Sequence, residues 1–428
     1  MTYLTGLRCP KCGKTYPIEV RPKGCTEHTD KPSNLTPTYD YAAIHKAFDR
    51  DALRDRAPNQ WRYREYLPAR EEDIVTLGEG MTPLVHVPRL GKAIGVPNLY
   101  VKNESVNPTW SHKDRMASVA VSVAPRFGKT GITASSSGNA GSATAAYAAR
   151  AGMDCVIFTV SEFPDVMKAQ MSVYGTKMIA VPTTADRWKM VDMLSSEYGW
   201  FTTAGFSAIP IGSNPYAVDG YKTLGFEICE QLGWTVPDAV VIPSGADLLW
   251  GAWKGFVEFH EAGYVDRKPR IIAAETFGPL KNALAKNLDY PETVPCGPTV
   301  AISVGVPYST YLFLKALRDS DGNAEDAGGD EAIMDMQLKL AALEGIYAEA
   351  SSTQSLAVVK RMREDGRIGE HDRIVAVLTS SGLKHTAVTS KLLPPIPAVD
   401  ADQQKVLQAL QSVYGFTVRK QPTSLGTH

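Results

Sequence analysis

Short apolar segments alternate with longer amphipathic stretches along most of the chain after residue 75. The short segments have the composition of buried strands, and the amphipathic stretches have the length of helices. One series predicts strands at 99–102, 131–134, 155–160 and 177–181, followed by helices that start near residues 113, 138, 164 and 185. A second series predicts strands at 239–243, 270–275 and 373–379, with helices over 220–232, 250–261, 331–343 and 353–364.

This alternation favours an α/β fold with two domains, each a mostly parallel twisted sheet covered by helices. Three stretches fall outside the alternation: a predicted helix at 41–56, a predicted polar loop at 319–331 and a predicted short amphipathic helix at 403–413. Parallel sheets of this kind bind ligands beyond the carboxyl ends of their strands. The loops at those ends are therefore the first candidates for a functional site.

The overall composition narrows the class of protein. The chain has 428 residues, and 45 Lys and Arg against 46 Asp and Glu give a net charge of −1. Because no basic stripe is present, we expect no nucleic-acid partner. No apolar run of about 18 residues exists and the first residues lack the pattern of a signal peptide, so we expect no membrane partner and a cytoplasmic location.

The first 30 residues carry a possible metal site. Cys9 and Cys12 are separated by two residues, and Cys25 and His28 repeat that spacing after a gap of twelve residues. Two such knuckles of thiolate and imidazole can close a tetrahedral zinc site, which would hold together a segment too small to fold alone. Four protein ligands leave no open position, so this zinc would be structural. The alternative is four unrelated residues in a flexible arm.

The segment 107–115 places a lysine where a reactive amine is expected. Lys113 follows a predicted strand and a turn with Asn107 and Pro108, and it begins a helix whose next residues are mostly apolar. A lysine at a buried helix start responds to desolvation with a lowered pKa, or it gives up its charge in an imine. The alternative is a surface lysine near a helix start.

Three further loops lie at predicted strand ends. In 135–152, three serines with Gly138 and Asn139 lead into an alanine-rich helix, and the free N–H groups of a helix start bind a carboxylate or phosphate. The turn in 243–256 is a second anion cradle of this kind. Thr379 leaves the end of a strand, where its hydroxyl can hydrogen-bond a ring nitrogen without protonating it. Each loop could also be an ordinary cap or turn.

Five segments taken together resemble one family of enzymes. They are GEGMTPL (78–84), NPTWSHKDR (107–115), NPYAVDGYKT (214–223), EGIYAEASSTQS (344–355) and LTSSGLK (378–384). Their order and spacing resemble the threonine synthase branch of the fold-type II, or tryptophan synthase β-subunit-like, pyridoxal phosphate enzymes. The resemblance extends over residues 75–390, and the cysteine knuckles also resemble those of archaeal-type threonine synthases.

The resemblance implies a role for each loop. Lys113 would be the Schiff-base lysine that holds pyridoxal 5'-phosphate and moves protons, Asn139 would hydrogen-bond the 3-oxygen of the cofactor, and Thr379 would face its pyridine nitrogen. The other positions form two sets: Gly245, Ala246, Asp247, Leu248 and Leu249 would cradle the cofactor phosphate, and Ser136, Ser137 and the N–H of Ala140 would bind the substrate carboxylate. A neutral hydroxyl opposite the pyridine nitrogen suits eliminations and replacements.

Three residues near the lysine or the cofactor depart from the family pattern. Trp110 stands where the family has glycine, and its indole should reshape the substrate pocket. His112 stands where the family has phenylalanine. It could donate to the substrate or titrate near neutrality, or it could simply pack behind the lysine. Asp247 brings a carboxylate into the phosphate cradle, where we expect its side chain to point away or to cap the following helix.

The residues that would hold a substrate phosphate also differ from the family pattern. Ile211, Gly212 and Ala217 stand where the family has Asn, Ser and Arg. Charge-assisted hydrogen bonds of the lost kind contribute roughly 1.5–3 kcal/mol each, so a phosphorylated substrate is in doubt. Compensating cations would have to come from elsewhere. The candidates are Lys102, Arg115 and Lys222.

We therefore expect an enzyme that uses pyridoxal 5'-phosphate for β- or γ-elimination or replacement on a small amino acid, similar to threonine synthase. The alternatives are a β-replacement enzyme similar to cysteate synthase, a dehydratase or ammonia-lyase of a specialised pathway, and a regulatory protein that retains the pocket. Relatives imply a homodimer. The expected parts are a zinc-ribbon-like arm (1–35), a large pyridoxal-phosphate-binding domain (36–107 and 209–395), a small mobile α/β domain (108–208) and a C-terminal tail (396–428).

Overall fold

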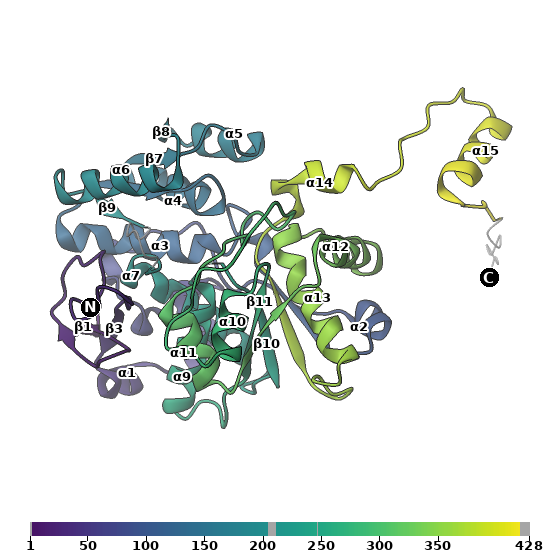
Figure 1. Ribbon diagram of the computed structural model, residues 1–428. Coiled ribbons are helices and arrows are strands. Elements are labelled where there is room, and N and C mark those ends of the chain that lie inside the picture. The colour runs from purple at the N-terminus through teal and green to yellow at the C-terminus, as the bar shows by residue number, and fades with distance from the viewer. Residues whose placement is uncertain (1, 204–210, 246, 420–428) are drawn as a thin grey trace. The chain divides into compact units, whose positions relative to one another are not determined.

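A computed structural model of the chain describes residues 2–203, 211–245 and 247–419 (Figure 1). Ala246, one of the predicted cofactor-binding residues, lies outside the described residues. The chain divides into a large unit, Met1–Lys384, and a C-terminal unit, His385–His428. No helix in the described ranges is long and apolar enough to cross a bilayer.

The largest sheet of the first unit has six strands in the order β12-β11-β10-β13-β5-β4. All neighbours are parallel except β4, which pairs antiparallel with β5 at one edge. The central strands β10 and β13 are buried along their whole length, which explains their continuous apolar sequences. The strands are β4 Leu84–His86, β5 Leu99–Asn103, β10 Ala239–Pro243, β11 Arg270–Glu275, β12 Asn323–Asp326 and β13 Ile374–Leu378.

Helices cover both sides of this sheet (Figure 1). On one side α13 packs across β10, β11 and β13, and on the other α9 packs against β10 and β11 and α11 packs against β11. Because β10 and β13 pair in parallel, their carboxyl ends lie next to each other. The helices of this part are α2 Pro88–Ile94, α7 Pro215–Val218, α8 Lys222–Gln231, α9 Leu248–Glu261, α10 Pro279–Ala285, α11 Tyr311–Asp319, α12 Asp330–Glu344 and α13 Ala350–Glu364.

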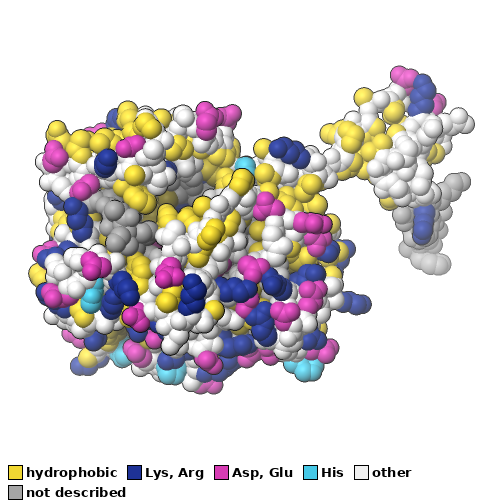
Figure 2. Space-filling model, viewed as in Figure 1, with side chains coloured by type: hydrophobic (Ala, Val, Ile, Leu, Met, Phe, Trp, Pro, Cys, Tyr) yellow, Lys and Arg dark blue, Asp and Glu magenta, His cyan; other side chains and the backbone are white. Residues whose placement is uncertain are grey.

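A second, smaller sheet has four parallel strands in the order β8-β7-β6-β9. Helix α4 packs on β6 and β7, and α6 packs on β6, β7 and β9. The molecular surface is hollowed between the part that carries α5 and α6 and the part below it (Figure 2). The elements are α3 Lys113–Val123, β6 Gly131–Ser135, α4 Asn139–Ala151, β7 Asp154–Thr159, α5 Asp165–Val173, β8 Lys177–Ala180, α6 Thr184–Ser196 and β9 Phe201–Thr202.

The N-terminal segment forms a third sheet of three antiparallel strands in the order β2-β1-β3. Its strands are β1 Leu4–Arg8, β2 Thr15–Tyr16 and β3 Thr36–Tyr39. The described part of the C-terminal unit contains α14 Thr386–Ser390 and α15 Gln403–Tyr414, so the helix predicted at 403–413 is confirmed. The α/β alternation predicted from the sequence is confirmed as well, with element bounds that differ by a few residues.

The helix predicted over 41–56 is wrong in its second half. Helix α1 covers Tyr41–Ala47 and ends at Phe48, which takes an extended conformation. A separate 3-10 turn follows at Asp51–Asp55. The helix ends here because the ring of Phe48 packs within a buried aromatic cluster. Its ring partners are Tyr63, Tyr66, Phe259 and Tyr264.

The polar loop predicted at 319–331 is also wrong in part, because its middle forms strand β12. This strand pairs in parallel with β11 at the edge of the large sheet. Its acidic side chains are neutralised by cations from distant parts of the chain: Lys281 donates to Asp326 at 2.6 Å, and Arg367 pairs with Glu325. Paired carboxylates are tolerated on an edge strand.

Candidate active site

The predicted reactive lysine begins helix α3 beside the ring of Tyr221. The Lys113 amine lies 5.7 Å from the centroid of that ring. Burial lowers the pKa of the Lys113 amine to about 8, although the negative charge of Asp247 opposes this shift. Roughly a tenth of the amine is therefore neutral at pH 7, far more than for an ordinary lysine, and the neutral amine is the form that attacks a carbonyl carbon.

The backbone before Lys113 is joined to the end of strand β13. The backbone N–H and the ring Nδ1 of His112 both lie within hydrogen-bond distance of the carbonyl of Thr379, at 2.9 and 3.1 Å. Because a carbonyl only accepts, Nδ1 carries the ring proton, and Nε2 is a buried acceptor without a partner in the described structure. Burial, reinforced by Lys113, holds the pKa of His112 well below its usual range. We therefore expect His112 to stay neutral rather than titrate near neutrality.

Trp110 adopts a backbone conformation that favours glycine. Its φ is 68°, a left-handed value that costs a non-glycine residue about 1–2 kcal/mol. Two hydrogen bonds hold this conformation, since the Trp110 carbonyl accepts from the Ser380 hydroxyl and the Ser381 N–H, both at 3.1 Å. The Trp110 side chain is 42% exposed, so the indole lies at the surface of this region rather than in its core.

Thr379 presents a hydroxyl group at the end of β13, as predicted. The residue is buried, and its Oγ1 lies 3.0 Å from Oγ of Ser352 on helix α13. Ser352 also accepts from the N–H of Ser380 at 3.0 Å, which ties the helix to the turn after the strand. A hydroxyl held by another hydroxyl remains a neutral hydrogen-bonding group.

The start of helix α4 forms the second predicted loop. Oγ of Ser136 accepts from the N–H groups of Gly138 at 3.2 Å and Gly141 at 2.9 Å. The Ser136 oxygen therefore caps the helix, and its hydroxyl proton is left to bind a ligand. Ser137 and Ala140 lie half-buried in the same turn. The first-turn N–H groups of a helix have no intrahelical acceptor, so this turn can bind an anion.

A buried carboxylate that was not among the predicted site residues meets Asn139. Nδ2 of Asn139 donates to Oε2 of Glu349 at 3.1 Å, and the hydroxyl of Ser303 donates to the other carboxylate oxygen. Glu349 is fully buried and immediately precedes α13. Glu349 lies inside the segment EGIYAEASSTQS (344–355). The sequence feature that could have identified it is an acidic residue directly before a run of small polar residues. Its pairing with Asn139 joins two loops that are 210 positions apart.

The turn after strand β10 leaves little space for side chains. A Cβ added to Gly245 would lie 2.7 Å from Cα of Val304, closer than real atoms approach. Leu248 and Leu249 are buried in the first turn of α9, so only their backbone groups can face a ligand. Gly245, Leu248 and Leu249 therefore leave only backbone groups to face an anion at this turn.

Asp247 in this turn does not cap α9, which was one of its two expected roles. Its Oδ2 instead accepts from the N–H and the hydroxyl of Ser213, at 2.9 and 2.7 Å. Its Oδ1 is buried and has no partner in the described ranges. Burial raises the pKa of Asp247, while the hydrogen bonds of Ser213 and the charge of Lys113 oppose that rise.

The three cations proposed to compensate for the altered phosphate residues are engaged elsewhere. Arg115 donates to Glu104 at 2.7 Å and to Glu227 at 2.7 Å, and Lys102 donates to Glu227 at 2.7 Å, with every side chain fully buried. Lys222 pairs with two carboxylates of its own, Asp219 at 3.1 Å and Glu258 at 3.0 Å. The hypothesis that these cations bind a substrate phosphate is therefore wrong.

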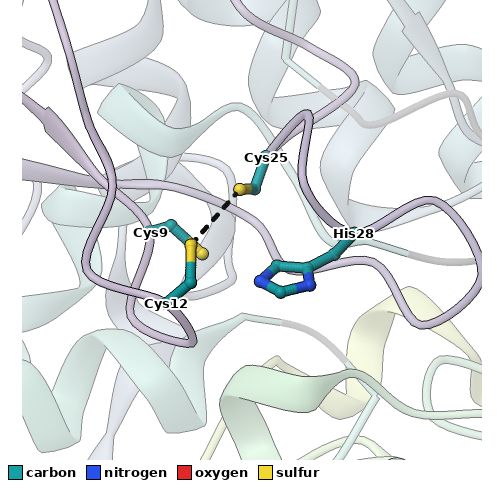
Figure 3. A group of neighbouring side chains, drawn as sticks. All are labelled: Cys9, Cys12, Cys25 and His28. Carbon is teal, nitrogen blue, oxygen red and sulfur yellow. Dashed lines mark hydrogen bonds between the residues drawn. The ribbon is translucent and has the colours of Figure 1, made fainter.

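The four predicted metal ligands converge at the N-terminal sheet (Figure 3). The donor atoms of Cys9, Cys12, Cys25 and His28 all lie within 4.8 Å of one another. Sγ of Cys12 and Sγ of Cys25 are 3.8 Å apart. Two sulfurs bound to one tetrahedral zinc at about 2.3 Å each would be about 3.8 Å apart, so the spacing fits zinc. The cluster can hold a metal ion.

Sequence comparisons agree with this geometry. A family model described as pyridoxal-phosphate dependent enzyme matches residues 75–380. A threonine synthase of Methanocaldococcus jannaschii is 38% identical over 389 residues, which cover 88% of this chain and 92% of the relative. A threonine synthase of Methanosarcina acetivorans is 33% identical over 415 residues, which cover 94% of this chain and 98% of the relative.

Solved structures share the fold at lower sequence identity. The processed form of threonine deaminase isoform 2 from Solanum lycopersicum aligns with a TM-score of 0.61 and 19% identity, covering 80% of this chain and 88% of that chain. A fungal L-serine ammonia-lyase from Rhizomucor miehei aligns with a TM-score of 0.60 and 20% identity, covering 72% and 96%. The family match and the threonine synthase relatives together show that this chain belongs to the pyridoxal-phosphate-dependent enzymes of the threonine synthase-like, fold-type II group.

Proposed function

We propose that the chain catalyses a β- or γ-elimination or replacement on a small amino acid, with pyridoxal 5'-phosphate held at Lys113. One observation carries the proposal. Lys113 has an amine with a pKa of about 8, and the backbone N–H of the residue before it, His112, donates to the carbonyl of Thr379. Family membership supplies the class of cofactor. When bound, the cofactor acts as an electron sink for the substrate's α-carbon.

The residues around Lys113 fit this cofactor. Val304 excludes a side chain at position 245, and backbone N–H groups at the start of α9 suit a phosphate. The side-chain amide of Asn139 donates one N–H to Glu349, and its second N–H could donate to the phenolic oxygen of the cofactor. Thr379 offers a neutral hydroxyl for the pyridine nitrogen, which leaves that nitrogen without a full charge.

The same residues suggest how the substrate would be held and how protons would move. Its carboxylate would lie at the start of α4, bound by the Ser136 hydroxyl proton, Ser137 and the N–H of Ala140. Lys113 would take a proton from one substrate carbon and return it to another, a role that suits a pKa close to the working pH. Trp110 and His112 would border the substrate side of this site.

The test is spectroscopic. Purified protein loaded with cofactor should show an absorbance band at about 410–430 nm that Lys113→Ala abolishes. Lys384→Ala is the matched control, because burial also lowers the pKa of Lys384 to about 8. If loading gives no band, or if the band survives in Lys113→Ala, the proposal fails.

A second candidate function follows from the altered phosphate residues. Ile211, Gly212 and Ala217 supply no cation, and the three alternative cations are paired elsewhere. These facts favour a β-replacement enzyme similar to cysteate synthase, or a dehydratase or ammonia-lyase. Incubation with O-phosphohomoserine and a panel of amino acids, with phosphate and 2-oxo acid release as readouts, separates these from a threonine synthase. Rapid phosphate release would exclude the second candidate.

We also propose the predicted division into parts. The strands of the four-stranded sheet all lie within 108–208, and those of the six-stranded sheet all lie within 36–107 and 209–395, which supports a small and a large domain. The converging donor atoms support zinc in the arm at 1–35. Light scattering tests the expected homodimer, and a monomer at micromolar concentration would contradict it.

A further inference from the structure

We propose that Lys384 is a positioning residue for the substrate: through Gln170 it holds helix α5 against the turn at the start of α4 that would bind the substrate carboxylate. This inference rests on the proposed function, because it concerns the place assigned to that carboxylate. It goes beyond the proposed function, because it gives a role to a buried lysine that neither holds the cofactor nor moves protons.

The first observation is a hydrogen bond that joins Lys384 to helix α5. Lys384 ends the 3-10 turn Gly382–Lys384, which lies just beyond strand β13. Its Nζ donates to Oε1 of Gln170 on α5 at 2.5 Å. Nε2 of the same amide donates to the carbonyl of Thr109 at 3.5 Å, in the segment that leads to Lys113. Gln170 therefore connects α5 to two chain segments that border the predicted lysine site.

The second observation is that Lys384 is buried without an ion pair. Its side chain is fully buried, and no carboxylate in the described ranges pairs with its amine. Burial lowers the pKa of Lys384 to about 8, while the charges of Asp114 and Glu349 oppose that shift. A buried amine is costly when it lacks a hydrogen-bond acceptor. Because Gln170 is the side-chain acceptor that the described residues provide, the position of α5 beside Lys384 is favoured over one that breaks this bond.

The third observation is the contact between α5 and the start of α4. Met167 and Met171, one turn apart on α5, are buried there. A Cβ added to Gly138 would lie 3.4 Å from Sδ of Met167. A Cβ added to Gly141 would lie 2.6 Å from Sδ of Met171, closer than real atoms approach. These glycines carry the N–H groups that donate to Ser136, so α5 packs directly on the turn that would bind the carboxylate.

The experiment measures amino-acid binding to the cofactor-loaded enzyme through the change in its absorbance band. The probes are glycine, L-serine and L-homoserine. Lys384→Met should keep the band and raise the dissociation constant of the probes about tenfold, because fewer molecules have α5 in place. Gln170→Met should have the same effect, and the double variant should bind no more weakly than either single variant. Lys339→Met, which removes a surface pair with Asp335 on α12, should leave binding unchanged.

Two results would overturn this proposal alone. One is an unchanged dissociation constant in Gln170→Met, whose half-buried side chain can be replaced even if Lys384→Met does not fold. The other is a double variant in which the two effects multiply, because residues that act through one hydrogen bond cannot act independently.

Two other results would reach further. A wild type with a normal band that responds to none of the probes refutes the carboxylate site at the start of α4, and this inference with it. A wild type that shows no band after loading refutes the proposed function itself. The band and the probe response therefore distinguish failure of the proposed function from failure of the role of Lys384.

Discussion

Removing one carboxylate from the buried network of Lys102, Glu104, Arg115 and Glu227 should destabilise the protein in a pH-dependent way. The four side chains are fully buried and carry two positive and two negative charges. Glu227→Gln keeps the shape and leaves one positive charge without its partner. Burial already lowers the pKa of Lys102, and the charge of Glu227 opposes that shift. Without Glu227 the amine of Lys102 should therefore become neutral in the folded state.

The magnitude follows from the cost of that neutralisation. Each unit of pKa shift is worth about 1.4 kcal/mol, and roughly 3.5 units separate pH 7 from the ordinary pKa of lysine, so the cost is at most about 5 kcal/mol. Breaking a buried ion pair typically costs about 3–5 kcal/mol, which agrees with this limit. The unfolded state of the variant binds one more proton than the folded state, so its stability rises with pH by about 1.4 kcal/mol per unit.

Chemical denaturation at pH 7 and pH 9 measures both quantities. The loss of unfolding free energy in Glu227→Gln should be about 4 kcal/mol at pH 7 and about 1–2 kcal/mol at pH 9. Asp335→Asn is the control, because it breaks an exposed pair with Lys339 that should contribute at most about 1 kcal/mol at either pH. A loss below about 1 kcal/mol, or an equal loss at both pH values, would refute the reasoning.

Three other predictions concern separate parts of the molecule. Because the pKa of Lys113 is about 8, the rate at which apoprotein takes up the cofactor should rise with pH up to about 8 and then level off; a flat profile from pH 6 to 9 would contradict this. Cys9→Ser combined with Cys12→Ser should abolish zinc in metal analysis, and unchanged stoichiometry would mean that the cluster is not a metal site. Trp110→Gly should raise the unfolding free energy by about 1 kcal/mol, because glycine takes the left-handed φ without strain; a decrease would show that indole packing outweighs that strain.

The strands whose apolar composition follows from burial alone could be predicted from the sequence. Strands β10 and β13 are buried on both faces, so their apolar runs are visible without any knowledge of neighbours. Strand β12 could not be found in this way, because its Glu325 and Asp326 have the composition of a loop. They are tolerated in a strand through Lys281 and Arg367, which lie some 40 positions away along the chain.

In the candidate site, too, features that depend on local sequence could be predicted and those that depend on distant partners could not. The positions of Lys113 at a helix start and of Thr379 after a buried strand could be predicted from the local sequence. Glu349 could not, since its role depends on Asn139, which is 210 positions distant. Arg115 was misjudged for the same reason: nothing local shows that its charge is already matched by Glu227, which is 112 positions away.

The N-terminal arm is connected by hydrogen bonds to Asp247, the residue that precedes helix α9. In the arm, the N–H of Cys25 donates to the carbonyl of Ser33 at 3.0 Å, and the next residue, Asn34, donates from Nδ2 to the carbonyl of Ser213 at 2.7 Å. Ser213 in turn fixes Asp247. A metal at Cys25 would therefore restrain the segment that sets the orientation of the Asp247 carboxylate. The hydrogen bonds of Asn34 and Ser213 thus connect the arm to the carboxylate whose charge acts on the Lys113 amine.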